Sequence, residues 1–249
     1  MEPGRGVAKH WSEELRYLLF GCAAPAALFA LLGWYNLSLL HDQVSGPDRP
    51  HSFAALLTGP LERAMYLAFV TIPVVIYITR PRALRRAGGL APRAAAFVGT
   101  TMLLAFPAIF ADGPRILPVP WPVHVLAELT LVVGTGFGVY GLTFLRHSFS
   151  IIPEARQLVR GGPYRIVRHP LYLAEITVAV SLVLQGDVHV WSGLIVVPFI
   201  IIQVVRSVYE EQLLRSAFPE YEEYARTTGR LFPRFVARRP SAHAVPTLT

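Results

Sequence analysis

Six apolar segments, separated by short polar stretches, constrain this chain more than any other feature of its sequence. They cover residues 15–40, 61–79, 94–111, 123–145, 170–185 and 190–205. A helix needs about 20 apolar residues to cross the hydrocarbon core of a bilayer, and the first four segments come close to that length. Charged residues make up only 16% of the chain, against roughly 25% in soluble domains. We therefore expect an all-α fold, a polytopic membrane helix bundle of about six spans.

The last two segments are shorter than the others and flank a turn-like Gly186-Asp187 pair. This pattern is typical of a helical hairpin that is tilted or only just spans the bilayer. We expect one membrane domain over residues 1–249, with four N-terminal spans in residues 1–145 and the loop, the hairpin and amphipathic C-terminal helices in residues 146–239. Residues 240–249 are expected to form a disordered tail.

The positive residues are distributed very unevenly over the two sides of a six-span arrangement. Twenty of the 23 Lys and Arg residues fall on one side, and only Arg49, Arg63 and Arg115 fall on the other. The positive-inside rule assigns the richer side to the cytoplasm. The sequence therefore predicts an integral membrane protein, in a bacterial inner membrane, with both termini cytoplasmic. We expect the arginines of residues 80–93 to lie against anionic headgroups.

Several classes of function are disfavoured by composition. Cys22 is the only cysteine, so the chain forms no internal disulfide, and no Cys/His cluster has the spacing of metal ligands. Only one of the positively charged residues is a lysine, and the chain has no lysine-rich run of the kind that binds nucleic acid. We expect neither a metal site nor a nucleic-acid partner. The number of subunits is not indicated.

The polar stretch before residue 170 contains features that are unusual for a simple connector. It has a Gly161-Gly162-Pro163 turn, and His169 directly precedes Pro170. Proline favours the first position of a helix, so His169 is expected at the helix start, where free backbone N–H groups can hold a carboxylate or another anion. Alternatively, Pro170 simply begins a helix and His169 is a solvated cap.

A second polar stretch follows the sixth apolar segment. Arg206 and Glu210 are four residues apart and share one helical face, whereas Glu211 points elsewhere. An ordinary surface ion pair between Arg206 and Glu210 is the alternative to a functional role. Pro219 is expected to begin another helix that folds back over the loop. The apolar stripe of that region consists of Leu213, Leu214, Ala217, Tyr221 and Tyr224.

The hairpin brings these two stretches together, because it carries the chain across the membrane and back. We expect a pocket with His169, Arg206 and Glu210 near Tyr164 and Tyr172. Glu175, one turn into an apolar helix, is either functional or paired with a nearby arginine. Such a pocket, at the boundary of cytosol and hydrocarbon, suits a charged soluble cofactor and a lipophilic substrate.

These residues also carry a resemblance to a known family. The run GPYRIVRHPLY, followed by Arg206, Glu210-Glu211 and later aromatic residues, resembles the C-terminal signature of the integral-membrane isoprenylcysteine carboxyl methyltransferase and phospholipid methyltransferase family. The signature includes Phe218, Tyr221, Tyr224 and Pro233, and the resemblance covers about 90 of the 249 residues.

The resemblance implies a methyltransferase that uses S-adenosylmethionine and acts on the carboxylate or amine of a lipophilic, isoprenoid- or lipid-like acceptor. It implies that the cofactor is bound by Arg156, Gln157, Leu158, Val159, Tyr164, His169, Pro170, Leu171, Tyr172 and Glu210. It associates Arg206 with the acceptor, and we add Glu175 as a second acceptor-binding candidate. Arg206, Glu210 and Glu211 are the catalytic candidates. Arg206 would orient a carboxylate, while Glu210, Glu211 or Glu175 would deprotonate an amine.

Two departures from the family pattern leave the acceptor open. Arg156 stands where the isoprenylcysteine enzymes often have histidine, and Ala174 replaces a common glycine. An NADPH-dependent membrane sterol or enoyl reductase is the enzymatic alternative, because those proteins have a similar sequence at a helix start. Their acidic residue corresponds to Glu175, but they have asparagine where this chain has Leu171. A non-catalytic membrane scaffold or transporter is the alternative from another class. Lipophilic small molecules and membrane lipid are the expected partners.

Overall fold

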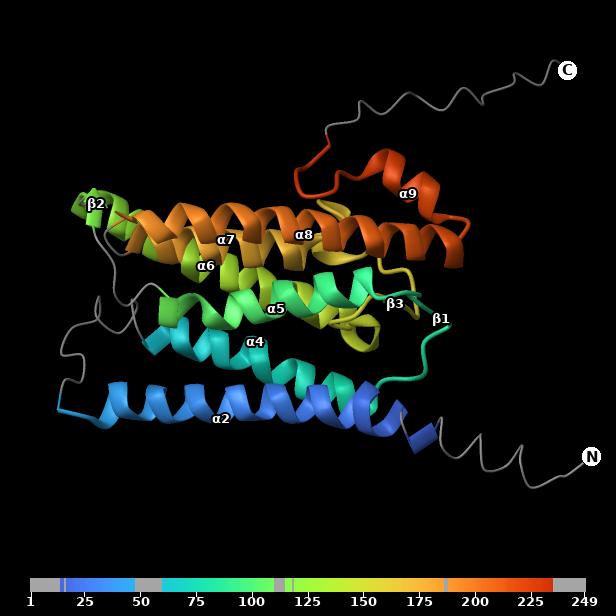
Figure 1. The fold of residues 1–249 in the computed structure, drawn as a ribbon, viewed down its shortest axis with the longest axis horizontal. Coiled ribbons are helices and arrows are strands. Elements are labelled where there is room, and N and C mark those ends of the chain that lie inside the picture. The colour runs from blue at the N-terminus through green and yellow to red at the C-terminus, as the bar shows by residue number, and fades with distance from the viewer. Residues whose placement is uncertain are drawn as a thin grey trace, which may run out of the picture.

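The computed structural model describes residues 14–15, 17–47, 60–109, 115–117, 119–185 and 188–234. Within these residues the chain is mostly helical (Figure 1). Two predictions, the turn at Gly186-Asp187 and the disordered tail of residues 240–249, lie outside the described residues.

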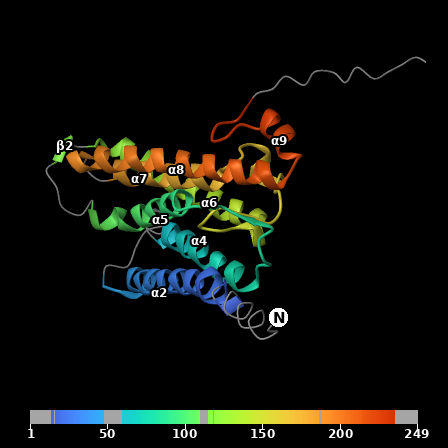
Figure 2. The same cartoon turned by 45° about the vertical axis from the view of Figure 1, so that its right-hand side comes forward.

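Six long helices coincide with the six predicted apolar segments. They are α2 (Ala24–Ser45), α4 (Pro60–Thr79), α5 (Ala91–Ile109), α6 (Trp121–Leu145), α7 (Pro170–Gln185) and α8 (Val190–Ala217). A π-helical turn, η1 (Tyr17–Ala23), precedes α2, and a short α9 (Tyr221–Thr227) follows α8. α4 packs between α2 and α6, and α7 packs against both α6 and α8, while α5 packs on α8 (Figures 1 and 2).

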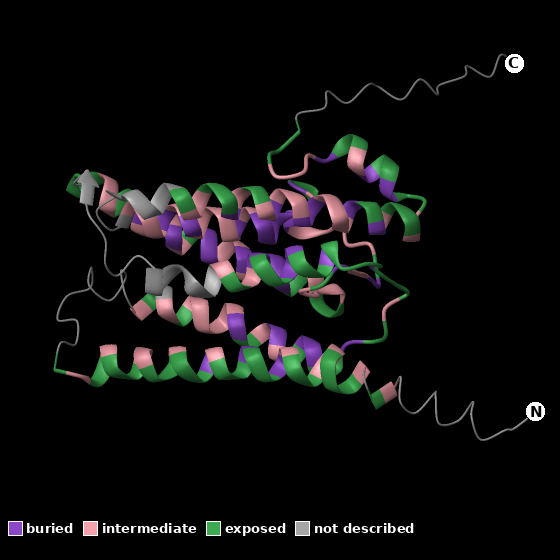
Figure 3. Ribbon diagram, in the orientation of Figure 1, coloured by how far each residue is buried: buried purple, intermediate pink, exposed green. Residues whose placement is uncertain are grey.

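Two stretches of the described chain are long and apolar enough to cross a membrane. One is Tyr17–Ser45, which combines η1 with α2, and the other is Trp121–Ser148, which extends α6. Shorter apolar runs occupy Arg63–Thr79 and Pro170–Leu184. Large apolar side chains such as Leu31, Trp34 and Phe97 are exposed on the outside of the bundle, and Figure 3 shows the outer face of α2 as mainly exposed. Such a surface is typical of contact with lipid. The number of crossings stays a prediction.

The predicted helical fold is accompanied by two very short strand pairs that the sequence alone does not predict. Among the described residues, β1 (Arg85–Arg86) pairs antiparallel with β3 (Glu154–Ala155), and β2 (Arg115–Leu117) pairs antiparallel with β4 (Val188–His189). These strands have two or three residues, too few to display an alternating pattern in the sequence. The β1–β3 pair matters for the site, because it ties the α4–α5 connection to the loop that follows α6.

Glycines on α6 allow α7 to lie close to it. A Cβ at Gly138 would lie 3.2 Å from the Ala174 side chain, and one at Gly141 would lie 3.1 Å from Leu171. Small residues are typical of closely packed helices in membrane proteins. This contact fixes the start of α7, and with it the position of His169.

The C-terminal segment folds back as the sequence predicts. The last turns of α8 pack on the β1–β3 pair, where Leu213 is buried with Ala87 and Ala155. α9 begins two residues after Pro219, and two of its own side chains, Tyr221 and Tyr224, are buried. The predicted apolar stripe thus packs against protein.

Candidate active site

The predicted meeting of the two polar stretches is confirmed. His169 directly precedes α7, and α8 returns two glutamates to it: Nδ1 lies 3.6 Å from Glu210 Oε2, and Nε2 lies 3.2 Å from Glu211 Oε1. His169 is only 4% exposed, and its ring stacks on that of Tyr172 at 5.4 Å. The imidazole therefore lies between two neighbouring carboxylates.

Glu211 is fully buried and surrounded by donors. Arg168 donates to it at 2.8 and 3.0 Å, Arg230 at 2.9 and 3.0 Å, and Arg215 at 3.1 Å. With His169, these bonds occupy the acceptor positions that a carboxylate offers. We therefore interpret Glu211, predicted from the sequence as a catalytic candidate, as a positioning residue. It is also absent from the residues that line the cavity described below.

The two carboxylates and the imidazole change one another's protonation. Burial alone would raise the pKa of Glu211, but hydrogen bonds from His169, Arg230 and Arg168 lower it far below the ordinary value. Burial alone would lower the pKa of His169, but Glu210 and Glu211 raise it. The site thus favours an imidazolium between two ionised carboxylates.

The C-terminal segment covers the loop through backbone contacts. The Arg168 N–H donates to the Gly229 carbonyl at 2.8 Å, and the His169 N–H donates to the Arg230 carbonyl at 3.1 Å. The Tyr224 hydroxyl donates to the Tyr164 carbonyl at 2.6 Å. The loop and the C-terminal segment therefore form one unit, which we call the clasp and define as residues 161–169 with residues 210–230.

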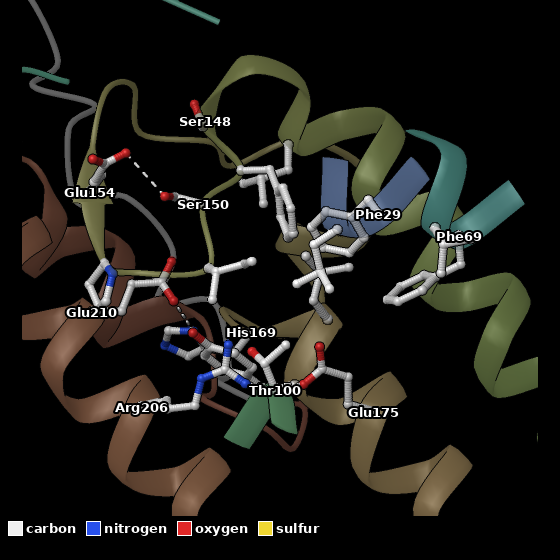
Figure 4. A pocket seen from close by; sticks show the side chains of 18 of the residues that line it. Phe29, Phe69, Thr100, Ser148, Ser150, Glu154, His169, Glu175, Arg206 and Glu210 are labelled. Carbon is white, nitrogen blue, oxygen red and sulfur yellow. Dashed lines mark hydrogen bonds and ion pairs between the residues drawn. The ribbon is translucent and has the colours of Figure 1, made fainter. Parts of the chain in front are cut away.

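A cavity begins beneath the clasp and runs between α2, α4, α7 and α8. Figure 4 shows His169, Arg206 and Glu210 on one side of it and Phe29 and Phe69 on the other. The polar end also has Tyr164, Arg168 and Tyr172, and the apolar end has Leu28, Leu32, Tyr66 and Val70. Its volume is about 80 Å³, whereas small-molecule pockets usually measure about 300–1,000 Å³. A nucleoside-sized ligand therefore requires the cavity to widen.

Arg206 contacts side chains of both α7 and α8. Its Nη1 donates to Gln203 Oε1 at 2.8 Å and lies 3.5 Å from Glu175 Oε2, and Gln203 also donates to Glu175. Its guanidinium lies over the Tyr172 ring at 4.9 Å. Arg206 thus pairs with Glu175, one of the two roles predicted for that residue, and not with Glu210, whose ion pair with Arg206 was the alternative to a functional role. We call Glu175, Gln203 and Arg206 the polar trio.

The polar trio retains one unused donor. The Nε of Arg206 is buried and has no hydrogen-bond partner among the described residues. Buried polar groups without partners are rare and call for an explanation. Because Arg206 lines the cavity, a ligand oxygen is the natural acceptor for this N–H.

Sequence reasoning missed two residues that hold Arg206 in place. Gln203 lies one turn before Arg206 on α8. A glutamine within an apolar helix needs hydrogen-bond partners, so the sequence could have indicated that Gln203 contacts a polar neighbour. Gly99 on α5 gives no signal in the sequence, yet a Cβ there would lie 2.8 Å from Arg206 Cδ. The position of the Arg206 guanidinium thus depends on α5, which is distant from Arg206 in the sequence.

The Gly161-Gly162-Pro163 turn forms as predicted and positions Tyr164. Gly162 has φ of 56°, which disfavours other residues, and a Cβ there would lie 2.7 Å from the Phe144 ring. The turn buries Tyr164 against the cavity. Pro170 begins α7, and Leu171 and Tyr172 line the cavity with Glu175.

The first part of the predicted cofactor segment lies elsewhere. Arg156 is buried, donates to the Pro81 carbonyl at 2.9 Å and pairs with Glu154. Within the described residues, none of Arg156, Gln157, Leu158 and Val159 lines the cavity. Their role in cofactor binding stays a prediction, and it would require this loop to move.

Comparison with known proteins gives the site a family context. Residues 124–221 match the phospholipid methyltransferase family. The nickel-cobalt-cadmium resistance protein NccN of Alcaligenes xylosoxydans xylosoxydans is 35% identical over 32% of this chain and 38% of its own length. The cobalt-zinc-cadmium resistance protein CzcN of Cupriavidus metallidurans is 37% identical over 31% of this chain and 36% of its own length. The chain thus aligns with little more than a third of either relative.

Proposed function

Because residues 124–221 match the phospholipid methyltransferase family, we propose that this protein is a membrane methyltransferase. It transfers a methyl group from S-adenosylmethionine to a lipophilic acceptor at the boundary of cytosol and membrane. The observation that carries the proposal is a single cavity with the His169–Glu210 contact at one end and apolar side chains of α2 and α4 at the other.

The polar end suits the charged cofactor. S-adenosylmethionine supplies an electrophilic methyl on a sulfonium, next to an ammonium, a carboxylate and an adenine. Glu210 lines the cavity and its side chain is 32% exposed, so it can accept from the ammonium, unlike the saturated Glu211. Tyr164 offers an aromatic ring to a cation or to adenine, whereas the Tyr172 ring already contacts His169 and Arg206 and completes the wall of this end. Arg168 lines the same end and, although it is paired with Glu211, belongs to a cluster of arginines whose net positive charge favours the carboxylate.

The polar trio suits the acceptor. Arg206 Nε is a buried donor without a protein partner among the described residues, and such a donor favours an anionic oxygen over an ammonium group. We therefore favour a carboxylate acceptor, whose oxygen is already nucleophilic. Arg206 orients that oxygen and the apolar end of the cavity holds the chain behind it. Alignment and exclusion of water supply about 7 kcal/mol or more of the barrier.

The clasp regulates access in this proposal. The cavity of about 80 Å³ requires opening, and the two parts of the clasp that would separate are joined by hydrogen bonds between residues 164–169 and residues 224–230. The opening and closing of such a lid often limits the rate of turnover. We propose that all six long helices cross the membrane, with the clasp and the arginine-rich loops in the cytoplasm, supported by the charge distribution.

The names of the two relatives refer to resistance against metal ions. The described residues contain no group of three or more His, Cys, Asp or Glu side chains that could hold a metal ion. Metal resistance is named only for those relatives, and for this chain we propose methyl transfer.

The test is to incubate the purified protein with methyl-labelled S-adenosylmethionine and lipids extracted from the host membrane. We expect label in a lipid fraction that mild alkali releases as methanol, which identifies a methyl ester. Label that resists alkali would identify an amine acceptor and overturn the choice of carboxylate. No label in any lipid, together with consumption of NADPH in a parallel incubation that contains NADPH in place of S-adenosylmethionine, would support the reductase instead.

A further inference from the structure

A second hollow lies on the other side of Glu154 from the cavity. It measures about 610 Å³ and shares only Glu154 with the lining of that cavity. The lining comes from η1, β1, the start of α5 and the loop that contains β3. Its residues are Tyr17, Phe20, Gly21, Arg86, Ala87, Arg93, Ile152 and Glu154. Neither the proposed cofactor nor the acceptor uses this hollow.

Positive charge dominates the hollow. Among the described residues that line it, Glu154 is the only acidic one, and this carboxylate is already paired with Arg86 at 3.2 Å, Arg80 at 3.5 Å and Arg156. Arg93 is exposed and has no acidic partner among the described residues. The arginines thus exceed the acids, and Arg86 and Arg93 remain accessible to an anion.

Apolar side chains adjoin these two arginines. Phe20 is 74% exposed, and Leu84 and Leu90, on either side of β1, are 69% and 80% exposed. Arg86 lies over the Tyr17 ring at 4.8 Å, which fixes its guanidinium beside that aromatic wall. A free inorganic anion gains nothing from exposed phenylalanine and leucine. An anion joined to acyl chains uses both kinds of surface.

We propose that this hollow is a binding site for an anionic phospholipid, with its phosphate between Arg86 and Arg93 and its acyl chains along Phe20 and the outer face of η1. The site is distinct from the methyl-transfer site and independent of it. It holds a membrane lipid at the junction of η1, β1 and α5. This junction also bears on the cavity, because Glu154 lines both.

The experiment measures lipid binding to the full-length protein in detergent by native mass spectrometry. The probes are dioleoylphosphatidylglycerol, the zwitterionic dioleoylphosphatidylcholine and inorganic phosphate. The double variant Arg86→Gln/Arg93→Gln is compared with the parent. We expect it to bind phosphatidylglycerol about 30-fold more weakly, since each arginine near an anionic lipid contributes about a factor of five. Phosphatidylcholine binding should not change.

The matched control is Arg165→Gln/Arg226→Gln, which removes the same charge from two exposed positions outside the hollow. It should bind phosphatidylglycerol within twofold of the parent. The double variant should fold, because Glu154 keeps Arg80 and Arg156. If the double variant does not fold, the single variant Arg93→Gln replaces it, because this change removes no described ion pair. It should lower the affinity for phosphatidylglycerol about fivefold.

Two results would overturn the proposal. Equal binding of phosphatidylglycerol by the parent and the Arg86/Arg93 variant would remove these arginines from any lipid site. Inorganic phosphate that displaces phosphatidylglycerol at equal concentration would mean that the hollow recognises phosphate without its lipid. Both measurements are independent of methyl transfer, so a failed activity assay would leave this proposal standing.

Discussion

The clasp and the polar trio both contain a buried carboxylate beside arginine, yet the charged groups at their centres, Glu211 and Arg206, differ in how completely they are paired. In the clasp, Glu211 accepts from four side chains and is closed to other partners. In the polar trio, Arg206 has a buried Nε without a partner among the described residues. A saturated cluster stabilises the fold, whereas an unsatisfied one is suited to a ligand. Mutations should therefore affect stability in the first and activity in the second.

The largest effect is expected for Glu211→Ala. Removing this carboxylate leaves Arg168, Arg215 and Arg230 without their shared partner, and breaking a buried pair costs about 3–5 kcal/mol. Thermal unfolding followed by circular dichroism in detergent should show a much lower melting temperature. The exposed Glu223→Ala is the control and should be neutral. An unchanged melting temperature for Glu211→Ala would mean that the clasp does not hold the fold together.

The polar trio is tested by Arg206→Lys, which keeps the charge but loses the planar fork and the Nε donor. We expect kcat/KM for the acceptor to fall about 100-fold, a loss of about 3 kcal/mol that is typical of a hydrogen bond to a charged group. Binding of S-adenosylhomocysteine should be nearly unchanged. A normal kcat/KM in this variant would remove Arg206 from acceptor recognition.

Gly99→Ala tests whether the position of Arg206, rather than its chemical identity, matters for activity. The added methyl would lie 2.8 Å from Arg206 Cδ, so the guanidinium must shift while its chemistry stays intact. We expect about a tenfold fall in acceptor kcat/KM. The control is Gly88→Ala, where an added Cβ meets nothing within 4 Å. Equal activity of the Gly99→Ala protein and the parent would show that Arg206 tolerates displacement.

The smallest effect is expected from titration of His169. Its pKa is raised because Glu210 and Glu211 outweigh the effect of burial. The imidazolium therefore stabilises the fold fully below the unfolded pKa of about 6.5, and this contribution is lost as the pH rises through the folded value. The melting temperature of the parent should fall by a few degrees between about pH 6 and pH 9, and His169→Gln should flatten that slope. Parallel slopes would contradict an imidazolium at this position.

The sequence predicts the helices well and the contacts of their side chains less well. Apolar length locates the long helices, and the hairpin brings His169 to Glu210 because an out-and-back path leaves few alternatives. Helical spacing correctly puts Arg206 and Glu210 on one face. It cannot show that Glu175 on α7 competes for Arg206, since that depends on how the helices are rotated about their axes.

The clasp shows a second limit of sequence-based prediction. The Glu210-Glu211 pair indicates a carboxylate-rich site, but only the fold shows that Arg168, Arg215 and Arg230 converge on Glu211 and leave Glu210 facing the cavity. The β1–β3 pair was missed for a related reason. Its strands are two residues long, and contacts between distant segments form them rather than any local preference.

The methyltransferase proposal is decided by titrating the purified protein with S-adenosylhomocysteine and, separately, with NADPH. We expect saturable binding of S-adenosylhomocysteine, at least tenfold weaker in Glu210→Gln because a charged hydrogen bond to the ammonium is lost, and no specific binding of NADPH. Tight binding of NADPH without any response to S-adenosylhomocysteine would contradict the methyltransferase. Equal affinity of Glu210→Gln and the parent for S-adenosylhomocysteine would contradict the site.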